Sequence, residues 1–307
     1  MPQYRTRPLV DRRDFLRISA GLTASIATGA MSLQSSWAAP PPAKWDLRND
    51  NNTGKNYIST PPQDQLDCHS CTAFGVVATI EGTYNKLNNI AYTDSNALGL
   101  SEAQLFFCGG PALRCDTSHW WPEDALVYCA RFGLAKRSDY PYPSSADLQD
   151  EWKTWCHVPP GNPPNLTKIL SEQKLNSVDD IKNWISTTGP VVAVMLEFQD
   201  FKVFGDQQPK GTPNAGIYVP QPKVTINKQQ QPNGVVGGHV LSIVGYDASS
   251  SKPEEQYWIC KNSWGKDWNG DGFINIQIGG VDKNDKDKNY NCLIDSLDVR
   301  GVAFTQI

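Results

Sequence analysis

The first half of the chain has the hydrophobic spacing of helices. Between residues 70 and 84, apolar positions recur at intervals of three and four: Ala73, Val77, Ile80 and Tyr84. This spacing places them on one face of a helix. Residues 100–107 and 122–132 predict two further helices, and the second begins with Pro122 followed by two acidic residues, which suits a first helical turn.

The second half has the pattern of strands. Four short apolar segments are bounded by Gly, Pro and Asp: residues 191–195, 240–244, 256–259 and 272–276. Segments of this kind predict buried β-strands. Helices followed by strands indicate an α+β fold, with a helical half at about residues 60–175 and a β-rich half at about residues 185–305.

The N-terminal residues have the pattern of an export signal. Arg12 and Arg13 precede a weakly apolar run, and small residues follow at Ala38 and Ala39. A charged region, an apolar region and a small-residue cleavage site indicate a signal peptide, and the arginine pair favours the bacterial twin-arginine route. We expect residues 1–38 to be removed and residues 39–307 to form one domain in the periplasm or outside the cell.

An amphipathic N-terminal helix is the alternative interpretation of this segment. The apolar run is too short and too polar for a transmembrane span. We therefore expect no stable association with the membrane once the signal has been cleaved.

Composition narrows the range of functions. The net charge of −4 and the pI near 5.6 argue against a nucleic-acid partner, which would require a basic face. Eight cysteines in an exported chain predict disulfides, because the compartment beyond the membrane is oxidising. Cys68 and Cys71 have the spacing of a zinc-binding pair, but no second pair completes a tetrahedral site. We expect neither a metal nor another cofactor.

The candidate chemistry lies in three motifs. Cys71 follows Gln65 by six residues and Cys68 by three, and much later come His239 and Asn262. The last two stand in the runs Gly-Gly-His-Val and Lys-Asn-Ser-Trp-Gly. Without the other motifs, a histidine beside two glycines would be read as a turn residue, and the asparagine run as a β-turn with an aromatic plug.

The order of Gln, Cys, His, Asn and Trp along this chain resembles that of the papain-like cysteine peptidases. Their signature around the reactive cysteine is C-G-[SA]-C-[WY], and this chain departs from it at His69 and Thr72. The resemblance implies a papain-like fold of two subdomains, one helical and one β-barrel-like, with the active site in the cleft between them. It also implies that packing beneath the nucleophile differs at Thr72 and that His69 narrows the cleft or adds a titratable group there.

The resemblance assigns a role to each polar residue of the motifs. Cys71 is the nucleophile, His239 the base and then the acid, Asn262 the group that orients the imidazole, and Gln65 an oxyanion donor. The residue types suit these roles, because a thiolate is the nucleophile and the start of a helix favours an anion. A neighbouring histidine can take the thiol proton and pair with the sulfur.

The resemblance also implies substrate-binding residues. Val194 and Gly238 are expected to form an apolar substrate pocket, Trp264 to cover the His–Asn hydrogen bond, and Trp268 to lie with it at the substrate-binding surface. The Gly-Gly pair that the family carries after Cys115 is replaced by residues 116–121, which end in two tryptophans. We expect substrate-backbone binding to differ there.

Disulfide pairing is likewise implied by the resemblance. It suggests Cys68 with Cys108 and Cys115 with Cys156. Cys260 and Cys292 are candidates for a third bridge, and Cys129 remains as a buried thiol on the helix at residues 123–132.

Two segments raise the question of regulation. The insert between Tyr218 and Val236 is expected to be a solvated loop, with a lid or a partner surface as the alternative. Only a few residues separate the predicted cleavage site from Trp45, where the run Trp-Asp-Leu-Arg resembles the mature N-terminus of the family. We therefore expect no inhibitory propeptide, and latency that depends on disulfides formed after export.

Three functions remain open at this point. The first is hydrolysis of peptide bonds in a peptide or protein substrate through a thioacyl-enzyme with Cys71. The second is the same intermediate resolved by an amine, as in transpeptidation or dedicated processing. The third is a catalytically silent peptide-binding module. The sequence leaves the substrate, endo- or exopeptidase action and the oligomeric state undecided.

Overall fold

A computed structural model describes residues 40–109, 115, 120–149, 156, 165–279 and 292–304. The predicted signal at residues 1–38 lies outside these ranges. Among the described residues, no helix combines the length and apolarity needed to cross a membrane.

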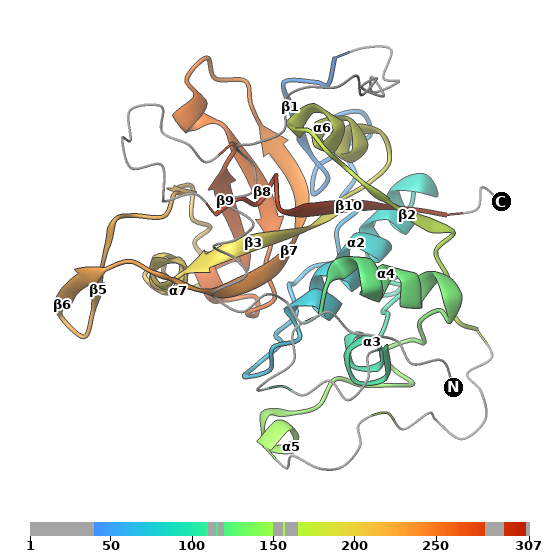
Figure 1. The fold of residues 1–307 in the computed structure, drawn as a ribbon. Helices are drawn as coiled ribbons and strands as arrows, with labels where there is room; N and C mark the ends of the chain where they lie inside the picture. The colour runs from blue at the N-terminus through green and yellow to red at the C-terminus, as the bar shows by residue number, and fades with distance from the viewer. Residues whose placement is uncertain are drawn as a thin grey trace, which may run out of the picture.

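An antiparallel sheet dominates the second half of the chain (Figure 1). Its strands lie in the order β2 (Ser171–Lys174), β10 (Asp298–Ala303), β3 (Val191–Phe198), β7 (Val235–Asp247), β8 (Tyr257–Lys261), β9 (Phe273–Gln277) and β4 (Ile217–Tyr218), and β1 (Lys44–Asp46) pairs with β7. The neighbours are antiparallel except β4 and β9, which are parallel. The four predicted strands are all present, as β3, β7, β8 and β9.

The helices between β1 and β2 gather on one side of the molecule (Figure 1). They are α2 (Cys71–Leu87), α3 (Glu102–Gly109), α4 (Pro122–Arg131) and α5 (Ser145–Gln149). Two more lie between strands, α6 (Val178–Thr187) and α7 (Gln199–Asp206), and short 3-10 turns occur at η2 (Pro253–Glu255) and η3 (Trp268–Gly270). The predicted α+β arrangement of a helical half and a β-rich half is confirmed.

The alternation of side chains along β3 creates two hydrophobic cores. Val191, Ala193 and Met195 point into the first core, which α6 covers. Val192 and Val194 point into the second, which lies beneath α2. Successive side chains of a strand face opposite sides, so one strand separates the two halves and contributes to both.

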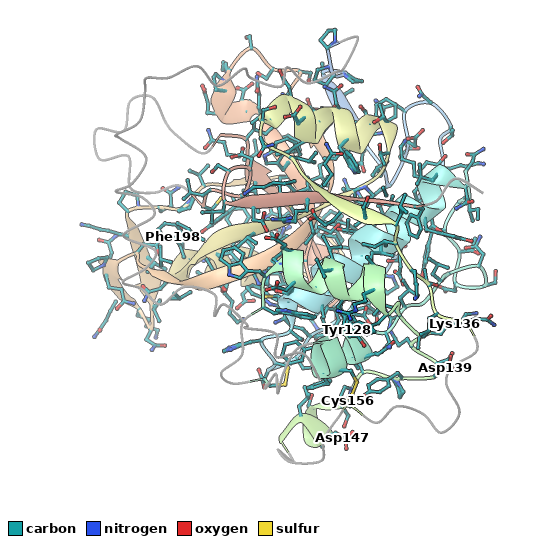
Figure 2. The ribbon with its side chains drawn as sticks, turned by 45° about the vertical axis from the view of Figure 1, so that its right-hand side comes forward. Tyr128, Lys136, Asp139, Asp147, Cys156 and Phe198 are labelled. Atoms are coloured by element: carbon teal, nitrogen blue, oxygen red, sulfur yellow. A yellow bond between two sulfur atoms is a disulfide. The ribbon has the colours of Figure 1, made fainter. Side chains whose placement is uncertain are left out.

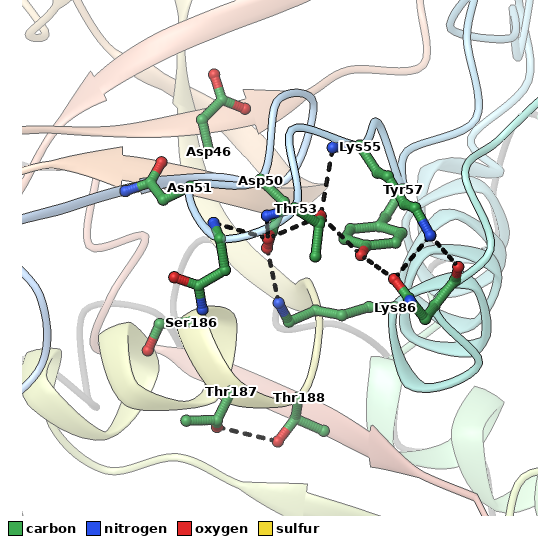
Figure 3. A network of polar contacts seen from close by, with 12 residues as sticks. Asp46, Asp50, Asn51, Thr53, Lys55, Tyr57, Lys86, Ser186, Thr187 and Thr188 are labelled. Carbon is green, nitrogen blue, oxygen red and sulfur yellow. Dashed lines mark hydrogen bonds and ion pairs between the residues drawn. The ribbon is translucent and has the colours of Figure 1, made fainter.

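The first helix extends beyond its predicted end because its polar residues have tertiary partners. Asn85 is buried and donates to the Tyr57 carbonyl at 3.0 Å. Lys86 donates to Asp50 at 2.9 Å, and Asp50 in turn accepts from the Thr53 hydroxyl at 3.0 Å (Figure 3). This network fastens the segment that follows β1 to the end of α2.

A buried arginine joins the helical half to the sheet. Arg300 on β10 has a side chain only 7% exposed, and it contacts Asp298 at 3.0 Å, Glu123 of α4 at 2.8 Å and Glu172 of β2 at 2.8 Å. Three carboxylates around one guanidinium compensate its burial, since a buried charge needs paired and hydrogen-bonded partners.

The insert between Tyr218 and Val236 is exposed, as expected, but it is a hairpin rather than an irregular loop. Strands β5 (Lys223–Ile226) and β6 (Gln229–Pro232) pair with each other and project beside α7 (Figure 1). Asp200 of α7 accepts from the Gln221 N–H at 2.8 Å, and Asn233 donates to the Gln221 carbonyl at 2.7 Å. These bonds fix the base of the hairpin to the helix.

The expected disulfide pairing is wrong. Cys68 is bonded to Cys115, and Cys108 to Cys156, which lies at the helical end of the molecule (Figure 2). The Cys115 carbonyl accepts from the N–H of His69 at 2.9 Å, so residue 115 lies against the loop that carries Cys68. The pairing of cysteines depends on which of them lie close together in the folded chain, so the intervals between them in the sequence do not determine it.

The expected third bridge is also wrong. Cys260 and Cys292 are both free and buried. Cys260 lies in the middle of β8, aligned with Ile243 and Ile274 of the neighbouring strands, and its side chain belongs to the core under α6. Cys129 is free and buried on α4, as expected.

Substitution of Arg300 tests the join between the two halves. Arg300→Met should lower the free energy of unfolding by about 3 kcal/mol, because Asp298 remains buried without its cation. Urea unfolding followed by tryptophan fluorescence measures this loss. Lys252→Met, which removes an exposed ion pair, is the control and should leave the midpoint unchanged. Equal midpoints for the two variants would contradict a stabilising role of the buried network.

Candidate active site

Cys71 is the first residue of α2, and its side chain borders an open cleft although it is only 8% exposed. The first turn of a helix presents N–H groups that have no intrahelical partner. These groups and the helix dipole favour a negative charge at this position. The Ser70 hydroxyl shares a hydrogen bond of 2.7 Å with the Tyr142 hydroxyl, which holds the start of the helix against the helical half.

His239 approaches the sulfur from the other half of the molecule. It lies on β7, opposite Met195 of β3, and its Nε2 is 2.8 Å from Oδ1 of Asn262. The imidazole also interacts with the Cys71 side chain, and the bond of Nε2 to Asn262 leaves Nδ1 as the ring nitrogen for the sulfur. The structure thus brings together the three residues Cys71, His239 and Asn262 from α2, β7 and the end of β8.

The surroundings keep the imidazole protonated. Burial alone would lower the pKa of His239, but the hydrogen bond to Cys71 and the charge of its sulfur, with contributions from Glu197 and Asn262, raise that pKa to about 9. An opposite charge at short range favours the charged form of a group. His239 is therefore an imidazolium at neutral pH, beside the sulfur.

Asn262 follows β8 directly, and its position is fixed from two sides. Its N–H donates to the Gly272 carbonyl at 3.0 Å, and its Oδ1 is bonded to the imidazole. Its Nδ2 is buried and has no hydrogen-bond partner among the described residues. The carbonyl end of the amide thus faces the histidine, which fits the expected orienting role.

An aromatic cluster covers the histidine. The rings of Trp264 and His239 lie 4.9 Å apart between centroids, and Trp264 meets Trp268 edge to face at 4.9 Å. Phe201 of α7 contacts all three rings, at 5.4 to 5.9 Å. Gly205 permits this packing, because a Cβ there would lie 2.2 Å from the Trp268 ring. The cluster shields the His–Asn hydrogen bond from water, as expected for Trp264.

Gln65 is held at the border of the same cleft as Cys71 by a fixed set of bonds. It is 6% exposed; its Oε1 accepts from the Ser263 hydroxyl at 2.5 Å, and its Nε2 donates to the Cys68 carbonyl at 2.7 Å. Its backbone N–H donates to the Ser263 carbonyl at 2.8 Å. The amide therefore turns its NH₂ group toward the Cys68–Cys71 loop, and one of its two N–H bonds has no acceptor among the described residues.

A cleft of about 1000 Å³ contains these groups. Its walls are the loop before α2, the adjoining ends of β3 and β7, and the tryptophan pair. Gly238, Trp264 and Trp268 border it as expected, and so does His69, which stands where the family signature has glycine.

The expected role of Val194 is wrong. Its side chain is buried with Val192 and Val240 beneath α2 and does not line the cleft. The alternation along β3 is the reason, since Val194 and Val192 share the face that is turned toward the helix. The substrate surface is formed instead by neighbouring residues at the end of this strand.

Packing next to the nucleophile differs from the family signature, as expected. Thr72 is buried, and its hydroxyl donates to the Trp120 carbonyl at 2.5 Å. A hydrogen bond to the backbone thus takes the place of an aromatic side chain. Residues 116–119, in the replaced Gly-Gly region, lie outside the described residues.

Sequence reasoning missed three residues of the site. Ser263 positions Gln65, Phe201 packs on His239, and Glu197 borders the cleft beside the imidazole. The position of Ser263 between Asn262 and Trp264 was a signal that it lies near the site. No pattern in the sequence indicates which group its hydroxyl binds, or which ring Phe201 contacts.

Together these groups can perform acyl transfer. A sulfur paired with an imidazolium is an activated nucleophile, and N–H groups near it can stabilise a developing oxyanion. The cleft leaves room for a bound chain to reach the sulfur.

The chain is similar in sequence to known cysteine proteases. Residues 41–296 match the family model described as papain family cysteine protease. A cathepsin L-like proteinase of Fasciola hepatica is 27% identical over 219 residues, which cover 71% of this chain and 56% of that protein. Papaya proteinase 4 of Carica papaya is 29% identical over 219 residues, covering 71% of this chain and 52% of the relative. The chain thus spans little more than half the length of these curated relatives.

Two solved structures are similar in fold. Digestive procathepsin L 3 of Tenebrio molitor larval midgut aligns with a TM-score of 0.60 and 23% identity, over 88% of this chain and 72% of that one. A Carica candamarcensis cysteine protease in complex with E-64 aligns with a TM-score of 0.54 and 22% identity, over 86% of this chain and all of that one.

Alkylation tests the activation of Cys71. Burial raises the pKa of Cys292 to about 12 and raises the pKa of Cys129 and Cys260 as well, so iodoacetamide at pH 7 should modify Cys71 alone among the free thiols of the folded protein. His239→Ala should slow the reaction about tenfold, because an isolated thiol is only a few per cent thiolate at pH 7.

His69→Ala removes the other imidazole that borders the cleft and serves as the matched control. It should keep most of the alkylation rate. Mass mapping identifies the modified residue. Equal rates in the wild type and in His239→Ala would contradict the proposed pairing of the thiolate with His239.

Proposed function

Because the chain belongs to the papain family of cysteine proteases, we propose that it hydrolyses peptide bonds through a thioacyl-enzyme formed on Cys71. The observation that carries this proposal is the hydrogen bond of His239 to the Asn262 carbonyl oxygen, together with its interaction with Cys71 at the border of one open cleft. A catalytically silent module would have no need of a complete and protonated site.

The geometry supports a sequence of two displacements. The Cys71 thiolate attacks the substrate carbonyl carbon, and the oxyanion is received by the Cys71 N–H and the side-chain amide of Gln65. The His239 imidazolium then gives its proton to the leaving amine, which departs while the acyl group stays on sulfur. Neutral His239 next takes a proton from the water that attacks the thioester carbonyl. The carbon–sulfur bond then breaks, the acid product leaves, and the Cys71 thiolate and the His239 imidazolium are restored.

Asn262 and Trp264 act through the histidine. The Asn262 oxygen accepts a hydrogen bond from Nε2 and keeps Nδ1 directed at the sulfur. As a neutral acceptor, asparagine leaves the imidazolium charge to the thiolate. Trp264 keeps water away from this bond, which strengthens it.

We also propose that the protein is exported by a bacterial twin-arginine route and acts in the periplasm or outside the cell. The arginine pair at Arg12 and Arg13 supports this proposal. The two disulfides support an oxidising compartment. Residues 1–38 would then be absent from the mature enzyme.

Labelling and hydrolysis test the proposed activity together. An epoxide-type cysteine-peptidase inhibitor should modify Cys71 stoichiometrically, and a casein digest should yield new peptides with free termini. Gln65→Ala should lower kcat about 10²–10³-fold, the usual loss for one oxyanion donor. Gln63→Ala, two residues away and exposed, is the control for a change of the same size.

The products distinguish the remaining functions. Labelling with hydrolysis supports the peptidase, whereas products that carry an added amine in place of water would support transpeptidation. A folded protein that neither labels nor cleaves would overturn the proposal and favour a binding module.

The pH profile tests the state of His239. Its pKa is raised to about 9, so the imidazolium is present below that pH and is lost above it. The value of kcat/KM should therefore fall as the pH rises through about 9, because the leaving amine no longer receives a proton. Asn262→Ala should move this alkaline limb to lower pH, since the Asn262 hydrogen bond raises the pKa of His239.

Alkylation of Cys71 by iodoacetamide is the internal control, because it needs the thiolate but no proton donor. Its rate should not fall above pH 9. An alkaline limb that Asn262→Ala leaves in place would show that another group controls it.

A further inference from the structure

Glu197 occupies a position in the cleft that the proposed mechanism does not use. It lies on β3, opposite Gly237 of β7, two residues beyond the pair of Met195 with His239. Its side chain is half-buried and lines the cleft, and its charge contributes to the protonation of His239. A carboxylate is thus presented beside the imidazolium.

No hydrogen bond or salt bridge joins this carboxylate to another described residue, and its electrostatic interaction with His239 leaves its oxygens open to the cleft. The space beside it is open, because a Cβ added at Gly237 would meet nothing within 4 Å. Gly237 has no positive φ, so the backbone does not require glycine there. The absence of a side chain leaves room next to Glu197 that a substrate can fill.

The charges around the cleft point to a cationic occupant. Both lysines that line it already have partners, Lys202 with Asp206 and Lys210 with Asp267. Glu197 has no lysine or arginine partner among the described residues, and the His239 imidazolium beside it is already paired with Cys71. A half-buried carboxylate is stabilised by a cation that comes within about 4 Å of it.

We propose that Glu197 selects substrates with a lysine or arginine on the leaving-group side of the scissile bond. The inference rests on the proposed peptidase activity. His239 donates its proton to the leaving nitrogen, so the chain that leaves lies next to His239, and Glu197 is beside it. The aliphatic part of such a side chain would pass over Gly237 and the exposed Val236, which line the same wall.

The same placement disfavours a free carboxylate at this end of the cleft. A substrate whose C-terminus lay beside His239 would bring a negative charge toward Glu197. The structure therefore points to cleavage within chains or near their N-termini rather than to removal of C-terminal residues.

Peptides that differ at one residue test the inference. Internally quenched peptides share one sequence before the cut and carry lysine, norleucine or glutamate directly after it, and mass spectrometry verifies the cut. For the full-length mature protein, kcat/KM should be roughly fivefold higher with lysine than with norleucine, the range of a partly exposed ion pair. Glu197→Gln should bring this ratio to about one, and Glu197→Lys should shift the preference to glutamate.

Two further variants separate specificity from structure. Gly237→Leu keeps Glu197 but fills the open space, and it should also reduce the lysine-to-norleucine ratio. Glu254→Gln makes the same chemical change on the exposed η2 turn and should keep the ratio. Rates are divided by the concentration of sites that the epoxide-type inhibitor titrates, so that unfolded protein does not contribute.

The outcomes distinguish the inference from the activity on which it rests. Cleavage of all peptides with equal kcat/KM, or a lysine preference that survives in Glu197→Gln, would overturn the role of Glu197 and leave the peptidase in place. Failure of the wild type to cleave any peptide would overturn the proposed activity and the inference with it. Loss of the preference with added salt would support the ionic origin.

Discussion

The packing of α2 against β3 and β7 is the constraint on which the site depends. It brings the N-terminus of a helix from one half of the chain to the middle of a strand from the other half. A shift of either element would separate Cys71 from His239 while leaving each half folded. The two residues face each other only because Val192, Val194 and Val240 fill the space between the helix and the sheet.

Burial of an imidazolium away from water raises its free energy, and interactions with the surrounding residues offset this rise. The sulfur provides the opposite charge, Asn262 a fixed acceptor, and the aromatic rings of Phe201 and Trp264 a covering that excludes water. Burial of a charge is tolerated when its partners are in place before the charge forms. The same arrangement that stabilises the resting ion pair is thus the one that can transfer a proton to a leaving group.

Much of the fold could be predicted from the sequence, because its elements follow local hydrophobic spacing. Helices α2 and α4 and strands β3, β7, β8 and β9 are all visible in that spacing. The polar landmarks of the site were visible in the motifs. What the sequence could not show depends on contacts between distant residues: the face of β3 on which Val194 lies, the partner of Cys68, and the bond from Ser263 to Gln65. The hairpin β5–β6 was missed for a related reason, since its strands are short and polar and their anchor is Asp200 on another element.

The bond between Cys68 and Cys115 sets a requirement on the redox environment of the enzyme. Cys71 must be reduced to react, yet Cys68, three residues away, must remain in its disulfide. The Cys68 carbonyl accepts from the Gln65 side chain, and the N–H of His69 donates to the Cys115 carbonyl, so the bridged loop positions Gln65. Both residues border the cleft, but Cys71 is a free thiol, whereas Cys68 is 1% exposed and bonded to Cys115. Thiol–disulfide exchange requires access to the sulfur that is attacked. A reductant therefore has little access to the bridge at Cys68 and more at the half-buried Cys115, so the enzyme requires surroundings that regenerate one cysteine and leave its neighbour oxidised.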